Sequence, residues 1–210
     1  MSRISFDLLP EKNREALNSV IEALGSTARL AGGTALMLQI KHRQSYDLDF
    51  FLSKSLGISH LERKLMNTLG RNLRLSYASS DQMNLEYNDI RISLIHFPFL
   101  PLESPLLIKN INITTLRDIA SEKVYTIGRR EEWRDYVDLF AILRRGNISI
   151  DQIISDCKKR FGDAFSLRLI LNQLSNASEV QLYSIDWLWK PIEPVEIYRF
   201  FTKIVKDLAT

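Results

Sequence analysis

The 210-residue chain has few of the residues that build disulfide-linked or zinc-binding proteins. Cys157 is its only cysteine, so the chain has no disulfide framework and no cysteine-based zinc site, and we expect a reducing environment. Of its three histidines, His60 and His96 have no partner at the spacing of a metal site, and we interpret His42 as structural.

Long apolar runs are missing as well. No window approaches the roughly eighteen uninterrupted apolar residues that a membrane span needs. The first ten residues contain no apolar core of signal-peptide length. We therefore expect a cytoplasmic protein that does not contact a membrane.

An excess of charge of one sign is also absent. The chain has 28 basic and 25 acidic residues, a net charge of +3, which does not by itself indicate a nucleic-acid partner. Hydrophobic residues make up 45% of the sequence, enough for the core of one domain or of two small ones.

Hydrophobic periodicity divides the chain into two parts. In the first part we predict helices over 10–25, 34–41 and 59–69, and strands over 29–31, 47–52, 73–77, 83–87, 90–95 and 106–108. In the second part we predict only helices, over 115–127, 131–145, 150–160, 164–174 and 195–209. Strands with helices followed by a run of helices predict an α+β fold with an α/β lobe, residues 1–112, and a helical lobe, residues 113–210.

Asp47 and Asp49 form the first candidate site. Alternate residues of a strand share a face, so the two carboxylates project together and away from Leu48 and Phe50. The apolar residues that follow predict a mostly buried strand, in which two acids are costly unless a cation neutralises them. Mg²⁺ (or Mn²⁺) is such a cation, and phosphates complete its coordination shell. A solvated strand face is the alternative.

A Gly32-Gly33-Thr34 turn precedes this pair, between a predicted strand and a predicted helix. Glycine allows the backbone to approach a ligand closely, and a helix N-terminus suits a phosphate. Thr34 can either cap the helix or donate its hydroxyl to a phosphate, and the sequence does not separate these roles.

Arg43 and Ser45 lie between that helix and the aspartates, so we include both among the nucleotide-binding candidates. Arg43 can neutralise phosphate oxygens. A surface arginine in a loop is the alternative.

A third cluster lies in the helical part. Asp138 occurs in an otherwise apolar helical segment, and Asp135 lies three residues earlier on the same face. A buried aspartate needs a cation, for which Lys123 is one candidate. An ion-pair lattice that pins two helices together is one interpretation. The other places Lys123 on a nucleoside triphosphate and one of the two aspartates in the active site.

Together these motifs resemble the AbiEii/AbiGii-type nucleotidyltransferase toxins of the polymerase-β-like nucleotidyltransferase superfamily. The resemblance covers about residues 28–145 and rests on Gly-Gly-Thr-Ala-Leu, His-Arg-x-Ser-x-Asp-Leu-Asp-Phe-Phe, a lysine-bearing helix and Arg-Asp-x-x-Asp-Leu. It implies a polymerase-β-like mixed-sheet lobe, a toxin–antitoxin or phage-defence context, a separately encoded antitoxin, an NTP substrate and an acceptor that is tRNA for some relatives. A protein acceptor is also open.

The resemblance also implies roles for individual residues. Gly33 and Thr34 would hold the phosphates, Asp47 and Asp49 would hold Mg²⁺, and Lys123 would contact the triphosphate. Asp135 and Asp138 match the Arg-Asp-x-x-Asp motif.

One position departs from the superfamily pattern. Ser93 stands on a predicted strand where many relatives have a third carboxylate that binds metal and activates the acceptor. We therefore predict a Mg²⁺-dependent nucleotidyltransferase, with two alternatives. One is a catalytically degenerate module that binds a nucleotide or a protein. The other is a small-molecule nucleotidyltransferase of the antibiotic-modifying kind.

Overall fold

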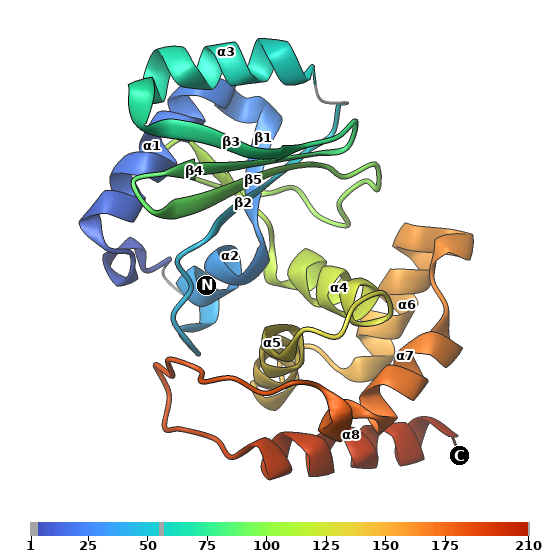
Figure 1. The fold of residues 1–210 in the computed structure, drawn as a ribbon. Coiled ribbons are helices and arrows are strands. Elements are labelled where there is room, and N and C mark those ends of the chain that lie inside the picture. The colour runs from blue at the N-terminus through green and yellow to red at the C-terminus, as the bar shows by residue number, and fades with distance from the viewer. Residues whose placement is uncertain (1–3, 55–56, 210) are drawn as a thin grey trace. The chain divides into compact units, whose positions relative to one another are not determined.

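The computed structural model describes residues 4–54 and 57–209. The chain divides into two compact units, Met1–Thr115 and Leu116–Thr210 (Figure 1). The first unit contains a mixed sheet with helices, and the second contains helices without a strand in its described residues.

The first unit is built on a seven-stranded sheet in the order β3-β4-β5-β2-β1-β7-β6. Its strands β2 and β5, and β1 and β7, pair in parallel, and the remaining neighbours are antiparallel. The strands are β1 (Ala28–Ala31), β2 (Leu48–Leu52), β3 (Leu73–Ala78), β4 (Gln82–Tyr87), β5 (Ile90–His96), β6 (Leu106–Ile108) and β7 (Ile111–Ile113).

The two faces of the sheet differ in polarity. Leu48 and Phe50 of β2 pair with Ile92 and Leu94 of β5, and all four are buried. The alternation of side chains along a strand puts the residues between them on the opposite face, where polar groups gather. Helices α1 (Glu11–Leu24) and α3 (Ile58–Leu69) pack against each other, and α3 also packs on β3 (Figure 1).

Helix α2 (Gly32–Ile40) connects β1 to β2 and packs against both strands. Every residue from Gly33 to Ile40 is buried, including Gln39, whose side-chain amide donates to the carbonyl of Thr114 at 2.9 Å. This helix is therefore a fixed support for the residues that surround its N-terminus.

Asn88 and Asp89, the two residues between the predicted strands 83–87 and 90–95, form the turn between β4 and β5. Asn88 and Asp89 have φ values of 48° and 65°, the conformation that a two-residue hairpin loop requires and that Asn and Asp tolerate. The predicted strand 106–108 is β6, which lies at the sheet edge. β7, Ile111–Ile113, was not predicted.

The second unit consists of α4 (Leu116–Ile127), α5 (Trp133–Arg144), α6 (Ile150–Phe161), α7 (Leu167–Ser175) and α8 (Pro194–Ala209). Aromatic side chains join α5 to α8, among them Phe140 and Phe200 with ring centroids 4.9 Å apart. On α6, burial raises the pKa of the Cys157 thiol to about 12, so we expect this cysteine to be unreactive.

Most predicted helix starts differ from the observed ones by one to three residues. α3 begins at Ile58 after Gly57, one residue before its predicted start, and no side chain caps it. α7 begins at Leu167, because 162–164 form a 3₁₀ turn and the Ser166 side chain accepts a hydrogen bond from the Leu169 amide. None of the helices in the described ranges has the length and apolar character to cross a membrane.

Candidate active site

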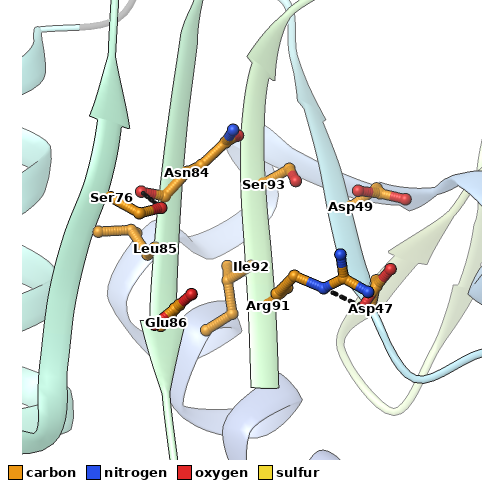
Figure 2. Close-up of a pocket in the computed structure, with 9 residues that line it drawn as sticks. All are labelled: Asp47, Asp49, Ser76, Asn84, Leu85, Glu86, Arg91, Ile92 and Ser93. Carbon is orange, nitrogen blue, oxygen red and sulfur yellow. Dashed lines mark hydrogen bonds and ion pairs between the residues drawn. The ribbon is translucent and has the colours of Figure 1, made fainter. Parts of the chain in front are cut away.

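The two aspartates lie on the polar face of the sheet. Asp47 immediately precedes β2 and Asp49 lies within it, and both line a cavity of about 200 Å³ (Figure 2). Polar side chains from the next three strands share this cavity: Ser76 of β3, Asn84 and Glu86 of β4, and Arg91 and Ser93 of β5.

The prediction that this strand buries its acids was wrong. Phe50 is fully buried, but the Asp47 side chain is 32% exposed and Asp49 is half-buried. Phe51, on the face of Asp49, is also half-buried and stacks on Phe97 with centroids 4.4 Å apart. Phe50 and Phe51 thus lie on opposite faces of the sheet, and the acids lie in a concave, water-accessible site.

Strand pairing fixes the neighbours of each aspartate. Ser93 pairs with Asp49, so a hydroxyl occupies the position beside it on β5. Arg91 Nε lies 3.1 Å from Asp47 Oδ1. Within 4–54 and 57–209, no three side chains among His, Cys, Asp and Glu gather into a metal-binding group.

Gly32 brings the backbone directly against Asp49. Its φ is 64°, a conformation that favours glycine, and a Cβ at this position would collide with Asp49 Oδ2. The first turn of α2 therefore begins beside the carboxylate. The N-cap residue Ala31 makes no side-chain hydrogen bond to this turn, and such a helix start can receive an anion.

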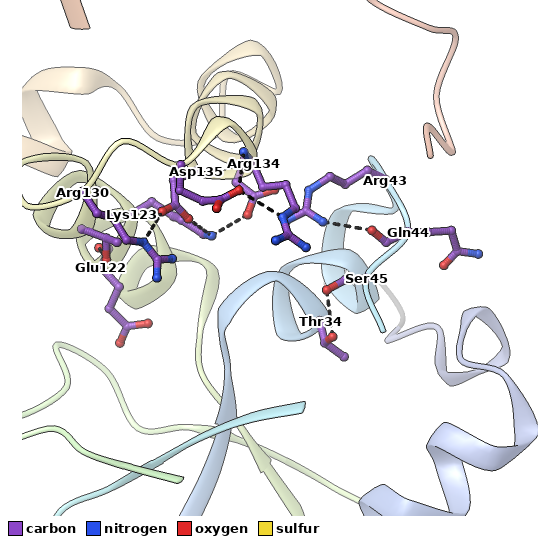
Figure 3. A network of polar contacts seen from close by, with 12 residues as sticks. Thr34, Arg43, Gln44, Ser45, Glu122, Lys123, Arg130, Arg134 and Asp135 are labelled. Carbon is purple, nitrogen blue, oxygen red and sulfur yellow. Dashed lines mark hydrogen bonds and ion pairs between the residues drawn. The ribbon is translucent and has the colours of Figure 1, made fainter. Parts of the chain in front are cut away.

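Arg43 and Ser45 pack against the backbone of Gly33, and Figure 3 draws both side chains beside Thr34. A Cβ on Gly33 would lie 2.8 Å from Arg43 Nη2 and 3.0 Å from Ser45 Oγ. Arg43 is buried, which contradicts the surface-arginine alternative, and its Nη1 donates to the carbonyl of Gln44 at 2.9 Å. The structure thus brings Gly33, Arg43 and Ser45 together at the start of α2.

Thr34 has a use that the sequence did not indicate. Its hydroxyl is buried and donates to the backbone carbonyl of Asp47, and it lies 3.0 Å from the Ser45 hydroxyl. This bond ties the first turn of α2 to the residue that begins the acidic pair, so Thr34 positions Asp47.

In the second unit, Lys123 lies between two buried aspartates (Figure 3). Its Nζ is 2.7 Å from Asp135 Oδ1 and 2.6 Å from Asp138 Oδ2, and Arg130 Nε is 2.9 Å from Asp135 Oδ2. Burial alone would raise the pKa of Asp135, but Lys123 and Arg130 outweigh it and the pKa is lowered. These contacts are the ones expected from the first interpretation, in which an ion-pair lattice pins two helices together. A contact between Lys123 and a nucleotide stays a prediction.

Three further polar side chains of the cavity were not predicted from the sequence. Asn84, Glu86 and Arg91 occupy the polar positions of strands that were predicted by their alternation. Their alternation showed that they share a face, but which strands adjoin β2 follows only from the sheet order.

The model of one protein family matches most of the chain. The match covers residues 15–188, and the family is described as the nucleotidyl transferase AbiEii toxin, type IV toxin–antitoxin system. The chain belongs to the AbiEii nucleotidyltransferase toxin family. A protein of Aquifex aeolicus that carries no functional description is 28% identical to this AbiEii-family chain over 207 residues, 95% of the chain and 97% of that protein.

Solved structures share the fold of this AbiEii-family member. MenT4, a nucleotidyltransferase toxin of Mycobacterium tuberculosis, aligns with a TM-score of 0.57 at 15% identity over 91% of this chain and 81% of its own. JHP933 of Helicobacter pylori gives 0.51 at 16% identity over 96% of both chains. ANT(2″)-Ia, solved with adenylyl-2″-tobramycin, gives 0.50 at 12% identity over 72% of this chain and 99% of its own.

These findings confirm the predicted family and the polymerase-β-like fold with its mixed sheet and helices. The protein is a nucleotidyltransferase related to toxins of toxin–antitoxin systems.

Proposed function

We propose that this protein uses Mg²⁺ (or Mn²⁺) held by Asp47 and Asp49 to transfer a nucleotidyl group from an NTP to a hydroxyl of tRNA. We propose further that it does so as the toxin of a toxin–antitoxin or phage-defence pair with a cognate antitoxin. One observation carries the proposal: both carboxylates line one cavity, and Asp49 lies directly against the glycine turn that begins α2.

The residues present fit such an ion. Mg²⁺ prefers oxygen ligands and is commonly bound by one or two carboxylates together with substrate phosphates. Asp47 and Asp49 provide two carboxylates on one face, and the start of α2 provides a place for a phosphate beside them. When bound, the ion neutralises charge on the transferring group.

The chain's own residues position the reactants. Gly32 allows the first turn of α2 and the Asp49 carboxylate to approach one phosphate group together. Thr34 fixes Asp47 through its backbone carbonyl, and the cluster of Gly33, Arg43 and Ser45 holds this turn rigid. In phosphoryl chemistry, positioning and charge neutralisation supply most of the catalysis.

Cationic side chains near the cavity support an RNA acceptor. Arg91 lines the cavity itself, and Arg71 and Arg74 line a second cavity of about 320 Å³ beside it, together with Glu86 and Asp89. Arginine pairs well with phosphate oxygens, which an RNA strand presents at every nucleotide.

The test is incubation of the purified chain with each labelled NTP, Mg²⁺, and either total RNA or total protein. We expect label in tRNA and loss of that label in Asp49→Asn, whose melting temperature should stay within about 2 °C of wild type, because a polar swap at a half-exposed site changes stability little. Full activity of Asp49→Asn would refute the proposal, and label in protein would refute the RNA acceptor.

One observation favours a second candidate, a module that binds nucleotides without turnover. Ser93 stands beside Asp49 where many relatives have an acid, so β5 places a hydroxyl rather than a carboxylate next to Asp49. NTP binding by the wild type, measured by calorimetry, without label in any acceptor would establish this alternative.

A further inference from the structure

We propose that Arg91 is the counter-ion of Asp47 in the metal-free protein and competes with the divalent cation for that carboxylate. This inference rests on the proposed function, since it assigns Asp47 to the metal. It makes Arg91 a positioning residue that sets the affinity of the site for the ion.

Strand register holds Arg91 at this position. Leu48 pairs with Ile92 in the parallel β2–β5 ladder, so the residues that precede them, Asp47 and Arg91, are neighbours. The guanidinium donates from Nε to Asp47 Oδ1 at 3.1 Å, as the dashed line in Figure 2 shows. This oxygen is one of those that a cation would need.

Arg91 can leave Asp47 at little cost. Its side chain is 66% exposed, and an ion pair in that environment contributes only about 0–1 kcal/mol. A divalent cation and a guanidinium on the same carboxylate would repel each other, so binding of one disfavours the other. In the competition proposed here, the metal displaces the arginine from Asp47.

A second carboxylate lies beside Arg91 to receive it. Glu86 of β4 pairs directly with Arg91 across the antiparallel β4–β5 ladder and lines the same cavity. Opposite charges on directly paired residues stabilise a sheet modestly, so the displaced guanidinium keeps a favourable partner. Glu86 thus gives the displaced arginine a counter-ion in the same cavity.

Arg74 offers a matched control. It pairs with Glu86 from the other side, on β3, and is exposed like Arg91. Replacing either arginine removes one positive charge next to Glu86. Arg91 is the one of the two that forms the ion pair with Asp47, so a change specific to Arg91→Ala reports on that contact.

The test titrates the full chain with Mn²⁺ in the absence of nucleotide. The electron paramagnetic resonance signal of free Mn²⁺ gives the unbound concentration, and from it the dissociation constant. We expect Arg91→Ala to bind Mn²⁺ about 3- to 10-fold more tightly than wild type, because a weak ion pair and a charge repulsion are both removed. We expect Arg74→Ala to change the affinity by less than about 2-fold, since its charge acts through solvent. Arg91→Lys should restore an affinity near wild type.

Equal effects of the two alanine variants, or no effect of Arg91→Ala while the wild type binds Mn²⁺, would overturn this inference and leave the proposed function intact. Two results would overturn both this inference and the proposed function. One is that Asp49→Asn binds Mn²⁺ as tightly as wild type; the other is that neither wild type nor Arg91→Ala binds Mn²⁺.

Discussion

Among single residues, Gly32 and Lys123 are tightly constrained by the polar side chains around them. Gly32 combines a left-handed backbone with direct contact to a carboxylate. Lys123 is 9% exposed and lies between Asp135 and the fully buried Asp138. A substitution at either position therefore changes more than one interaction at once.

Gly32→Ala should reduce nucleotidyl transfer strongly, because its Cβ would push the Asp49 carboxylate away. Gly25→Ala is the matched control: Gly25 has a φ of 66°, and no atom of the described residues beyond its own neighbours lies within 4 Å of where a Cβ would be. Both variants should lose stability, because a residue with a Cβ rarely adopts a positive φ, and urea unfolding measures that loss. If Gly32→Ala keeps the activity of Gly25→Ala, Asp49 does not depend on this contact.

Lys123→Met should destabilise the second unit by about 3–5 kcal/mol, because it leaves two buried carboxylates without their shared cation. That corresponds to a fall in melting temperature of roughly 6–20 °C. Lys158→Met, at an exposed position on α6, should stay within about 0.5 kcal/mol of wild type. An unchanged melting temperature with weakened NTP binding would instead assign Lys123 to the nucleotide.

Between elements, buried ion pairs join the helices of the second unit. Arg117 of α4 binds Asp156 of α6 through two hydrogen bonds of 2.6 and 2.7 Å. Arg160 of α6 reaches Asp118 at 3.0 Å and Glu122 at 2.8 Å on α4. The α4–α6 contact thus includes several ion pairs, and its stability should depend on pH.

Asp156→Asn should lower the free energy of unfolding at pH 7 by about 1.5–3 kcal/mol, the range for hydrogen bonds to charged groups. The Arg117 hydrogen bond lowers the pKa of Asp156 below its usual 3.8. A depressed pKa contributes stability above the unfolded value, which is lost as the pH falls through the folded one. Urea unfolding at pH 7 and near pH 3 should therefore show a smaller difference from wild type at the lower pH; a constant difference would contradict this.

In the molecule as a whole, the candidate metal site lies in the unit formed by residues 1–115, on the polar face of a sheet whose other face forms a core. Ligand binding to that face should stabilise the folded state without changing the fold, because any ligand that binds only the native form shifts the unfolding equilibrium.

A non-hydrolysable NTP with Mg²⁺ at about 100 times its Kd should add about 2.7 kcal/mol to the stability of the unit that binds it. Calorimetric melting should show the shift for wild type and for Lys158→Met. Asp49→Asn should lose most of it. A shift of equal size in Asp49→Asn would separate nucleotide binding from the acidic pair.

Local residue patterns were enough to predict the elements and the shared face of the two aspartates. Period-2 alternation predicted β3, β4 and β5, and 3.6-residue periodicity predicted the five helices of the second unit, because local packing imposes these periods. The Gly32-Gly33-Thr34 turn and the order of motifs were enough to predict the family.

Which side chains meet could be learned only from the folded chain. The sheet order places Arg91 and Ser93 of β5 beside β2, although more than forty residues separate Arg91 from Asp47 in sequence. The fold also leaves Asp47 partly exposed, bonds Thr34 to the Asp47 backbone, and pairs Lys123 with both of its aspartates. Such contacts depend on long-range strand pairing and helix packing, which local residue patterns do not encode.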